Sequence, residues 1–214
     1  IVISCLIIVL PLLLILKQPG LGTSLVLVAI LIGMLYMSGV SIFRLICLVG
    51  LGAIAVLIFW PHLEIYQQRR VLVFLYPDID PLGASYQLIQ SKIAIGSGGL
   101  WGKGLFAGTQ SQLSFLPDQH TDFIFAVLGE ELGFMGGVAL LFLYSIVLWR
   151  GLMIAEMAKD GLGGMLAIGV VSMLFFQIFV NVGMTMGIMP ITGMPLPFIT
   201  YGGNSFLVFS IAIG

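Results

Sequence analysis

Six apolar stretches fill most of this 214-residue chain, and they restrict its fold more than any other feature. Each is close to the roughly 20 mainly apolar residues that a helix needs to cross a membrane. They are residues 1–16, 21–40, 45–60, 123–149, 165–189 and 198–214. Hydrophobic residues make up 60% of the chain, against about 45–50% in a soluble domain. The sequence therefore predicts an all-α polytopic membrane protein.

A long polar segment divides the apolar stretches into two groups. We expect three transmembrane helices in residues 1–60, a long loop in 61–121, and three more transmembrane helices in 122–214. A segment of this length is too polar to span a membrane and too long for a simple turn. About half of the chain's Asp, Glu, Lys, Arg and His residues lie in it, so the loop is where we expect chemistry.

The basic residues of the short links predict the orientation. Arg44 lies in one link, and Arg150 and Lys159 lie in another link on the same side of the predicted membrane, whereas Lys17 lies on the opposite side. Lys and Arg concentrate on the cytoplasmic side of membrane proteins. The long loop is therefore predicted to face outward.

Charge and metal-ligand patterns exclude several functions. The net charge of −1 provides no basic surplus for binding nucleic acid. Cys5 and Cys47 both lie in apolar runs, and neither they nor His62 and His120 have the spacing of a zinc site. Carboxylates together with water and substrate phosphates can still hold Mg²⁺ or Mn²⁺.

A glycine-rich run, GSGGLWGKG at 96–104, suggests a nucleotide site but does not fit one. A P-loop would need glycine at Ser97 and a hydroxyl residue at Gly104. The run from Gly102 to Ala107 fits G-x-G-x-x-A, but no β-strand pattern precedes it. Two interpretations stay open: a backbone cradle for a diphosphate with Lys103, or a flexible turn at the membrane surface.

Three carboxylates lie in or beside the fourth apolar stretch, in a chain with only 8% charged residues. Asp122 precedes the apolar run directly, so Thr121 or Asp122 could simply cap the helix, and a functional role is the alternative. On a helix Glu130 lies within a quadrant of Asp122 and about 12 Å deeper, whereas Glu131 points to the opposite face. The two glutamates need a cation or a wet cavity.

Prolines and glycines break the apolar pattern at residues 189–205, MPITGMPLPFITYGGNS. Non-helical backbone at membrane depth is tolerated only where protein or a water-filled cavity covers it. The segment is either a plain loop between helices or a loop that dips back to line a site.

Two long motifs resemble the SEDS family of bacterial cell-wall proteins, and its RodA branch in particular. They are IQSKIAIGSGGLWGKGLFAGTQSQLSFLPDQHTDFIFAVLGEELG at 89–133 and VNVGMTMGIMPITGMPLPFITYGGNS at 180–205. The resemblance implies a ten-span fold of which these six stretches are the fifth to tenth. Gly20 departs from the family, which carries an aspartate there.

The family resemblance also implies an activity. The protein would be a peptidoglycan glycosyltransferase that polymerises lipid II at the outer face of the bacterial cytoplasmic membrane, for cell elongation and shape. The aspartate of the family motif H-T-D-F falls on Asp122, which favours a catalytic role over a cap. As an inverting enzyme it would use Asp122 as general base for the acceptor hydroxyl.

The remaining site residues follow from the same resemblance. The departing diphosphate needs cations or a divalent metal, Mg²⁺ or Mn²⁺. The expected partner is a class B penicillin-binding protein, and the alternatives are a lipid II flippase or an inactive scaffold for that partner. The implied substrate-binding residues are Arg69, Arg70, Lys92, Lys103, Gln110, Gln112, His120, Thr121, Glu130 and Glu131.

Overall fold

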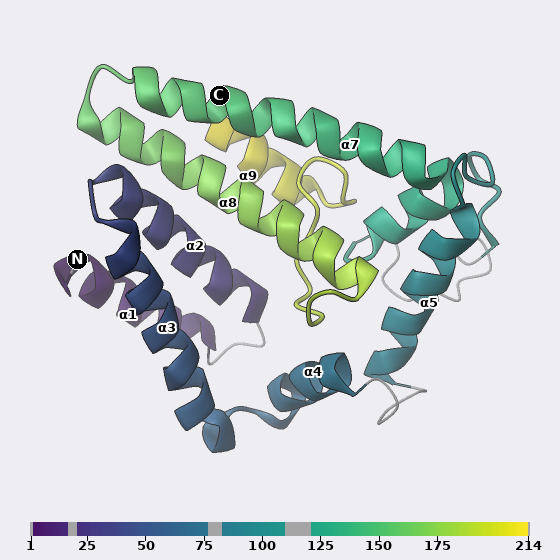
Figure 1. The fold of residues 1–214 in the computed structure, drawn as a ribbon, viewed down its shortest axis with the longest axis horizontal. Helices are drawn as coiled ribbons and strands as arrows, with labels where there is room; N and C mark the ends of the chain where they lie inside the picture. Colours follow the sequence, from purple (N-terminus) through teal and green to yellow (C-terminus); the bar gives the residue numbers. More distant parts are fainter. Residues whose placement is uncertain (1, 17–20, 77–82, 110–120, 214) are drawn as a thin grey trace. The chain divides into compact units, whose positions relative to one another are not determined.

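The computed structural model describes residues 2–16, 21–76, 83–109 and 121–213. All regular secondary structure within these ranges is helical (Figure 1). The chain divides into two compact units. Unit 1 comprises residues 1–68 and 148–176, and unit 2 comprises residues 69–147 and 177–214.

The helices of the described residues follow the apolar pattern of the sequence closely. They are α1 (Val2–Leu16), α2 (Leu21–Met37), α3 (Ile42–Ile58), η1 (Trp60–His62), α4 (Ile65–Leu75), α5 (Ala84–Gly98), α7 (Ile124–Met157), α8 (Gly161–Met186) and α9 (Gly203–Ile213). Each of the six apolar stretches contains a helix, which confirms the all-α prediction. By length and composition α7 and α8 can cross a membrane, and α1, α2 and α3 are shorter apolar helices.

Two helix boundaries differ from the prediction. α7 continues eight residues beyond the predicted end at Trp149, because no proline interrupts the following turns, and Arg150 therefore lies within the helix rather than in a link. α9 begins at Gly203 rather than at Phe198. Phe198 has a φ of 65°, which a helical residue cannot adopt, so the helix begins after it.

Unit 1 is held together by apolar contacts and by close approaches at small residues. Leu31 and Leu35 of α2 form a buried cluster with Leu45 of α3. A Cβ at Gly33 of α2 would overlap the Ser172 hydroxyl of α8, so these helices pack tightly at that point. Small residues at helix contacts are typical of membrane helices, which cannot rely on the hydrophobic effect to associate.

α3 exposes most of its apolar side chains. Phe43 and Leu57 each retain 72% of their accessible surface, and Leu45 is the buried residue of this helix. A contiguous apolar surface of this kind is rare on soluble proteins and marks a contact with lipid or protein. The apolar helix surface agrees with a membrane location.

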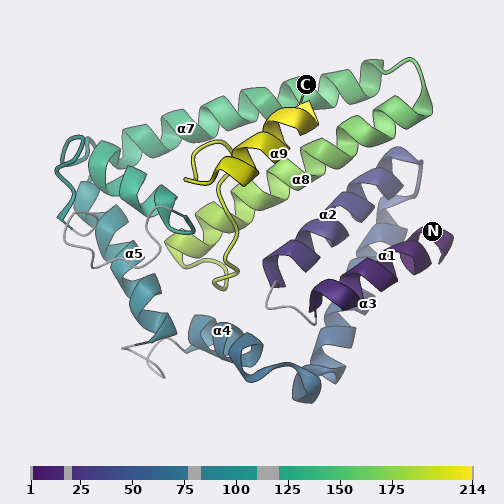
Figure 2. The same cartoon turned by 180° about the vertical axis from the view of Figure 1, so that it is seen from behind.

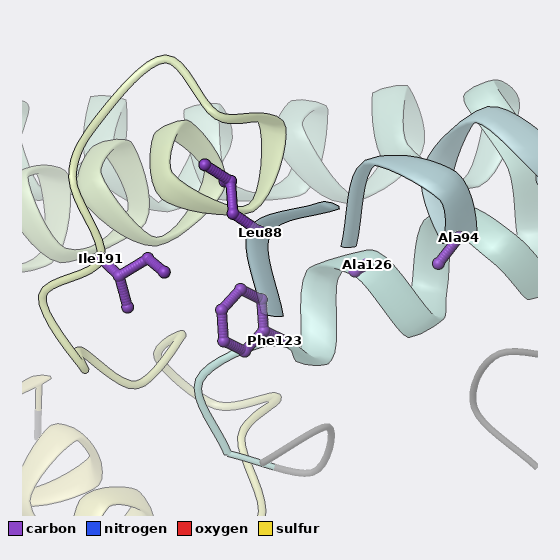
Figure 3. Close-up of a cluster of buried hydrophobic side chains, with 5 residues drawn as sticks. All are labelled: Leu88, Ala94, Phe123, Ala126 and Ile191. Atoms are coloured by element: carbon purple, nitrogen blue, oxygen red, sulfur yellow. The ribbon is translucent and has the colours of Figure 1, made fainter. Parts of the chain in front are cut away.

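Unit 2 is organised around a buried cluster that joins three segments distant in the sequence. Leu88 and Ala94 come from α5, Phe123 and Ala126 from the start of α7, and Ile191 from the segment after α8 (Figure 3). The cluster therefore fixes the residue that follows Asp122.

The described part of the polar segment forms helices as well as loop. It contains α5 and α4, whose sequence IYQQRRVLVFL places polar residues before an apolar run. The sequence predicts a loop here, because its polarity argues only against a membrane span, and the two short helices are not evident from that polarity.

Candidate functional site

Asp122 lies in a turn that immediately precedes α7. The Phe123 carbonyl accepts hydrogen bonds from the N–H groups of Ala126 at 2.9 Å and Val127 at 3.3 Å. An N-cap residue is the one whose carbonyl accepts the first helical bond. Phe123 therefore holds the cap position, and the interpretation of Asp122 or Thr121 as the N-cap is corrected. Phe123 is also only 1% exposed, so it anchors the turn in the core of unit 2.

The Asp122 carboxylate faces a glycine of the segment between α8 and α9. A Cβ placed at Gly193 would lie 3.4 Å from Asp122 Oδ2 and 3.7 Å from Arg70 Nη1. Gly193 has a φ of 72°, a conformation that favours glycine. An acid before α7 and a cation of α4 thus meet at the same glycine, although they are far apart in the sequence.

The connecting segment, residues 187–202, is a packed element rather than a plain loop. Figure 2 shows it between the end of α8 and the start of α9. Leu196 and Pro197 are fully buried, and the Tyr144 hydroxyl of α7 donates a hydrogen bond to the Pro197 carbonyl. Protein covers the backbone at Leu196 and Pro197, which is what non-helical backbone at membrane depth would require. Of the two predicted interpretations, the structure favours the loop that packs back beside the site.

Two polar side chains bind the backbone at Asp122. Asn181 of α8 donates through Nδ2 to the Asp122 carbonyl at 2.9 Å and to the Met194 carbonyl at 2.6 Å. The Thr200 hydroxyl donates to the Thr121 carbonyl at 3.1 Å. Asn181 was not among the site residues predicted from the sequence. The available signal was its position as one of two amides in a mainly apolar helix.

The glycine-rich run binds to a break in α7 at Gly133, where φ is 66° and ψ is −163°. In a regular helix the N–H groups of Phe134 and Met135 would bond to the carbonyls of Glu130 and Glu131. Here these two N–H groups donate instead to the carbonyls of Gly99 and Leu100, at 2.9 and 3.1 Å.

The two helix carbonyls that the break releases also find partners in the run. The Lys103 N–H donates to the Glu130 carbonyl and the Gly104 N–H donates to the Glu131 carbonyl, both at 3.0 Å. Because the Gly102 N–H bonds to the Gly98 carbonyl at 2.8 Å, all three N–H groups are occupied. The run is therefore neither a flexible turn nor a cradle of free donors. It completes the hydrogen bonding of α7.

Close backbone contact explains the glycines of the run. A Cβ at Gly98 would overlap the Gly129 carbonyl oxygen and lie 3.0 Å from the Glu130 carbonyl oxygen. A Cβ at Gly102 would overlap the Glu131 carbonyl oxygen, and φ there is 77°. α5 and the run can approach α7 only because these positions have no side chain.

We expect Gly98→Ala to lower the stability of the protein by about 1–3 kcal/mol or more, because backbone of α7 blocks the new methyl group. Gly96→Ala is the matched control. It lies on the same helix, no described atom lies within 4 Å of its Cβ, and alanine gains helix propensity of up to about 1 kcal/mol. Thermal unfolding in detergent measures both, and equal unfolding temperatures for the two variants would contradict the contact.

A buried ion pair reinforces the same junction. Lys103 Nζ lies 2.8 Å from Glu130 Oε1 and donates to the Thr109 hydroxyl at 2.9 Å. The Thr109 hydroxyl donates to Glu130 Oε1 at 3.2 Å. Glu130 is completely buried, and the Lys103 side chain is 27% exposed. The cation that a buried glutamate was expected to need is thus Lys103, a residue of this chain.

The other predicted site residues are dispersed. Lys92 of α5 lies against Gly187 at the end of α8, where a Cβ would be 2.5 Å from its Nζ. Arg69 is exposed beside Arg70, and the Glu131 side chain is partly buried. Gln110, Gln112 and His120 lie outside the described residues, as does Gly20. The described residues include no group of three or more His, Cys, Asp or Glu side chains that could hold a metal ion.

Comparison with known protein families identifies the family of this chain. The family model for FtsW, RodA and SpoVE, described as "Cell cycle protein", matches residues 1–214. The chain belongs to the FtsW/RodA/SpoVE family. This confirms the SEDS resemblance, whose motifs include the segments that meet at Asp122.

Curated relatives of the FtsW/RodA/SpoVE family align over most of the chain. It is 48% identical over 217 aligned residues to the peptidoglycan glycosyltransferase MrdB of Escherichia coli K12, covering 99% of this chain and 58% of MrdB. It is 43% identical to the stage V sporulation protein E of Bacillus subtilis, covering 94% of this chain and 55% of that protein. The chain thus spans little more than half the length of these relatives.

A solved structure has the same fold. This structure is described as "Structural coordination of polymerization and crosslinking by a peptidoglycan synthase complex". The TM-score is 0.77 at 33% identity, over 98% of this chain and 58% of that one. The chain therefore has the fold of part of this longer solved protein.

Proposed function

We propose that this chain carries the active site of a peptidoglycan glycosyltransferase that polymerises lipid II, the undecaprenyl-diphosphate-linked disaccharide-pentapeptide. The observation that carries the proposal is the meeting of the Asp122 carboxylate with the Arg70 guanidinium at Gly193. An acid and a cation at one point suit a reaction in which a proton leaves one group and negative charge develops on another. The name of MrdB, a peptidoglycan glycosyltransferase, supports the same reaction.

The reaction is a single inverting displacement. The 4-hydroxyl of the acceptor sugar attacks C1 of the donor, the bond from C1 to the diphosphate oxygen breaks, and the diphosphate leaves with the electron pair. Asp122 takes the proton of the attacking hydroxyl as general base. Since the donor is α-linked and the product β-1,4-linked, no covalent intermediate with the enzyme is needed.

Arg70 stabilises the negative charge that develops on the departing diphosphate, because it is the described cation that shares Gly193 with Asp122. Arg69, its neighbour in the sequence, and Lys92 are further proposed diphosphate ligands. A bound Mg²⁺ or Mn²⁺ would be held mainly by phosphate oxygens and water, and would neutralise the same charge. Polymerisation measured with EDTA and with added Mg²⁺ tests the metal.

The proposal includes a location and a partner. The six apolar stretches correspond to the last six of ten spans in a bacterial cytoplasmic membrane, with Asp122 at the outer face. The partner is a class B penicillin-binding protein, which would crosslink the glycan strands as they form. The solved relative is described as part of a peptidoglycan synthase complex that coordinates polymerisation with crosslinking, and this supports the pairing.

A polymerisation assay tests the proposed function. The intact protein, reconstituted in liposomes with and without its partner, receives labelled lipid II, and the products are separated by size. We expect a ladder of glycan chains. Movement of lipid II across the bilayer without any polymer would support a flippase instead, and neither activity in the presence of the partner would support a scaffold.

A further inference from the structure

Two consecutive carbonyl groups, those of Thr121 and Asp122, are each bound by a buried side chain from another part of unit 2. Asn181 binds the Asp122 carbonyl and Thr200 binds the Thr121 carbonyl. Backbone next to a helix start could bond to water or to the helix itself. Here two separate side chains bind it, so the position of this turn is determined by α8 and the connecting segment.

The same two side chains also bind the connecting segment. Asn181 Nδ2 donates to the Met194 carbonyl, next to the glycine that faces the Asp122 carboxylate. The Thr200 hydroxyl accepts a hydrogen bond from the Leu196 N–H at 2.7 Å. Each side chain therefore links the backbone at Thr121 or Asp122 to the connecting segment, which the Asp122 carboxylate faces at Gly193. Together they set the distance between the two.

The two polar atoms of the Asn181 side chain differ in their hydrogen bonding. Its Nδ2 makes two hydrogen bonds to carbonyl oxygens, which fixes the orientation of the amide. Its Oδ1 is buried without a hydrogen-bond partner among the described residues. A buried polar atom without a partner costs stability, so the two bonds made by Nδ2 have to offset that cost. The structural role of Asn181 therefore lies in its Nδ2 group, which donates to two carbonyls, and not in its Oδ1 atom.

Phe123 provides a third point of attachment. It packs in the cluster of Figure 3 with Ile191 of the connecting segment and Leu88 of α5. The residue that follows Asp122 is therefore fixed by apolar contacts, while the carbonyls before and at Asp122 are fixed by hydrogen bonds. The backbone on both sides of Asp122 is thus held in place while its carboxylate faces Gly193.

We propose that Asn181 and Thr200 are positioning residues that hold the Asp122 carboxylate in register with the connecting segment at Gly193. The inference rests on the proposed function, since it assigns them to the geometry of the general base. Neither residue takes a proton or touches the reacting atoms. Their effect is on the rate of the chemical step, because a shift of about 1 Å in a catalytic group can cost about 10²-fold.

The test compares matched variants in the intact protein. Thr200→Val keeps the shape of the side chain and removes the hydroxyl, whereas Thr200→Ser keeps the hydroxyl. Asn181→Leu removes the amide, and Gln177→Leu is its control. Gln177 lies one turn earlier on α8 and also has a buried side-chain oxygen without a partner among the described residues. Lipid II polymerisation gives kcat and KM, and thermal unfolding is measured alongside.

We expect Thr200→Val and Asn181→Leu to lower kcat by about 10²-fold with little change in KM for lipid II. Thr200→Ser and Gln177→Leu should polymerise at the parent rate. Equal kcat in Thr200→Val and Thr200→Ser would overturn the proposal, as would a rise in KM with kcat unchanged. If Asn181→Leu does not fold, the two Thr200 variants still decide.

The controls separate this inference from the proposed function. A parent protein that forms no polymer with its partner would refute the proposed function itself. An active parent whose Thr200→Val and Asn181→Leu variants polymerise normally would leave the function intact and refute the positioning role alone.

Discussion

Asp122→Asn is expected to abolish lipid II polymerisation while the protein stays folded in the membrane. An amide has nearly the same shape as the carboxylate, so the packing against Gly193 is preserved. It cannot accept the proton of the acceptor hydroxyl, and loss of a general base typically costs about 10²–10⁴-fold in rate. Polymer formed per minute from labelled lipid II measures the loss, and the unfolding temperature in detergent shows whether the fold is retained.

Asp160→Asn is the matched control for this substitution. Asp160 precedes α8 and its Oδ2 accepts a hydrogen bond from the Gly163 N–H at 3.1 Å, which an asparagine oxygen can also accept. We expect normal polymerisation from this variant. Near-parent activity in Asp122→Asn would remove Asp122 from the catalytic role and leave its position at Gly193 as a structural feature.

The helices could be predicted because their cause is local. Long apolar runs with few charges form helices in or beside a membrane, since only internal hydrogen bonding satisfies the backbone there. All six stretches contain a helix for this reason. The start of α9 was harder to predict, because the positive φ of Phe198 depends on how the connecting segment packs rather than on its own sequence.

The site could be predicted only in part, because its contacts join distant segments. Asp122 could be identified from a motif, but nothing in the sequence distinguishes Arg70 from Arg69, Lys92 and Lys103 as the cation nearest to it. Gly193 brings the two together, and no local pattern links position 193 to position 70 or 122. Asn181 was missed because α8 carries two amides, Gln177 and Asn181, and the sequence does not reveal which carbonyls either one will bind.

The break in α7 shows the same limit. Glycine pairs are common in membrane helices, and nothing near Gly133 indicates that its neighbours exchange their helical hydrogen bonds for bonds to residues 99–104. The exchange replaces two helical hydrogen bonds with four bonds to the glycine-rich run, so all four backbone groups that the break releases stay bonded. It does require glycine where the two backbones touch, which is the physical meaning of the glycine-rich motif.

Lys103→Ala is expected to lower the free energy of unfolding by about 3–5 kcal/mol, because it leaves the fully buried Glu130 carboxylate without its cation. The value should lie toward the lower end, since the Lys103 side chain is 27% exposed and the ion pair is therefore partly screened by solvent. Lys159→Ala, a lysine in the link between α7 and α8, is the control and should unfold like the parent. Unfolding in detergent measures both variants.

The double variant Lys103→Ala with Glu130→Gln separates the two roles of Lys103 that the sequence suggested. A neutral glutamine needs no cation, so the double variant should be more stable than Lys103→Ala alone. If Lys103 serves only to hold the glycine-rich run on α7, polymerisation should recover together with stability. If it also binds the diphosphate, the double variant should be stable and still slow. Since Lys103 Nζ already contacts Glu130 and Thr109, we expect the first outcome, and a stable but inactive double variant would return Lys103 to the substrate site.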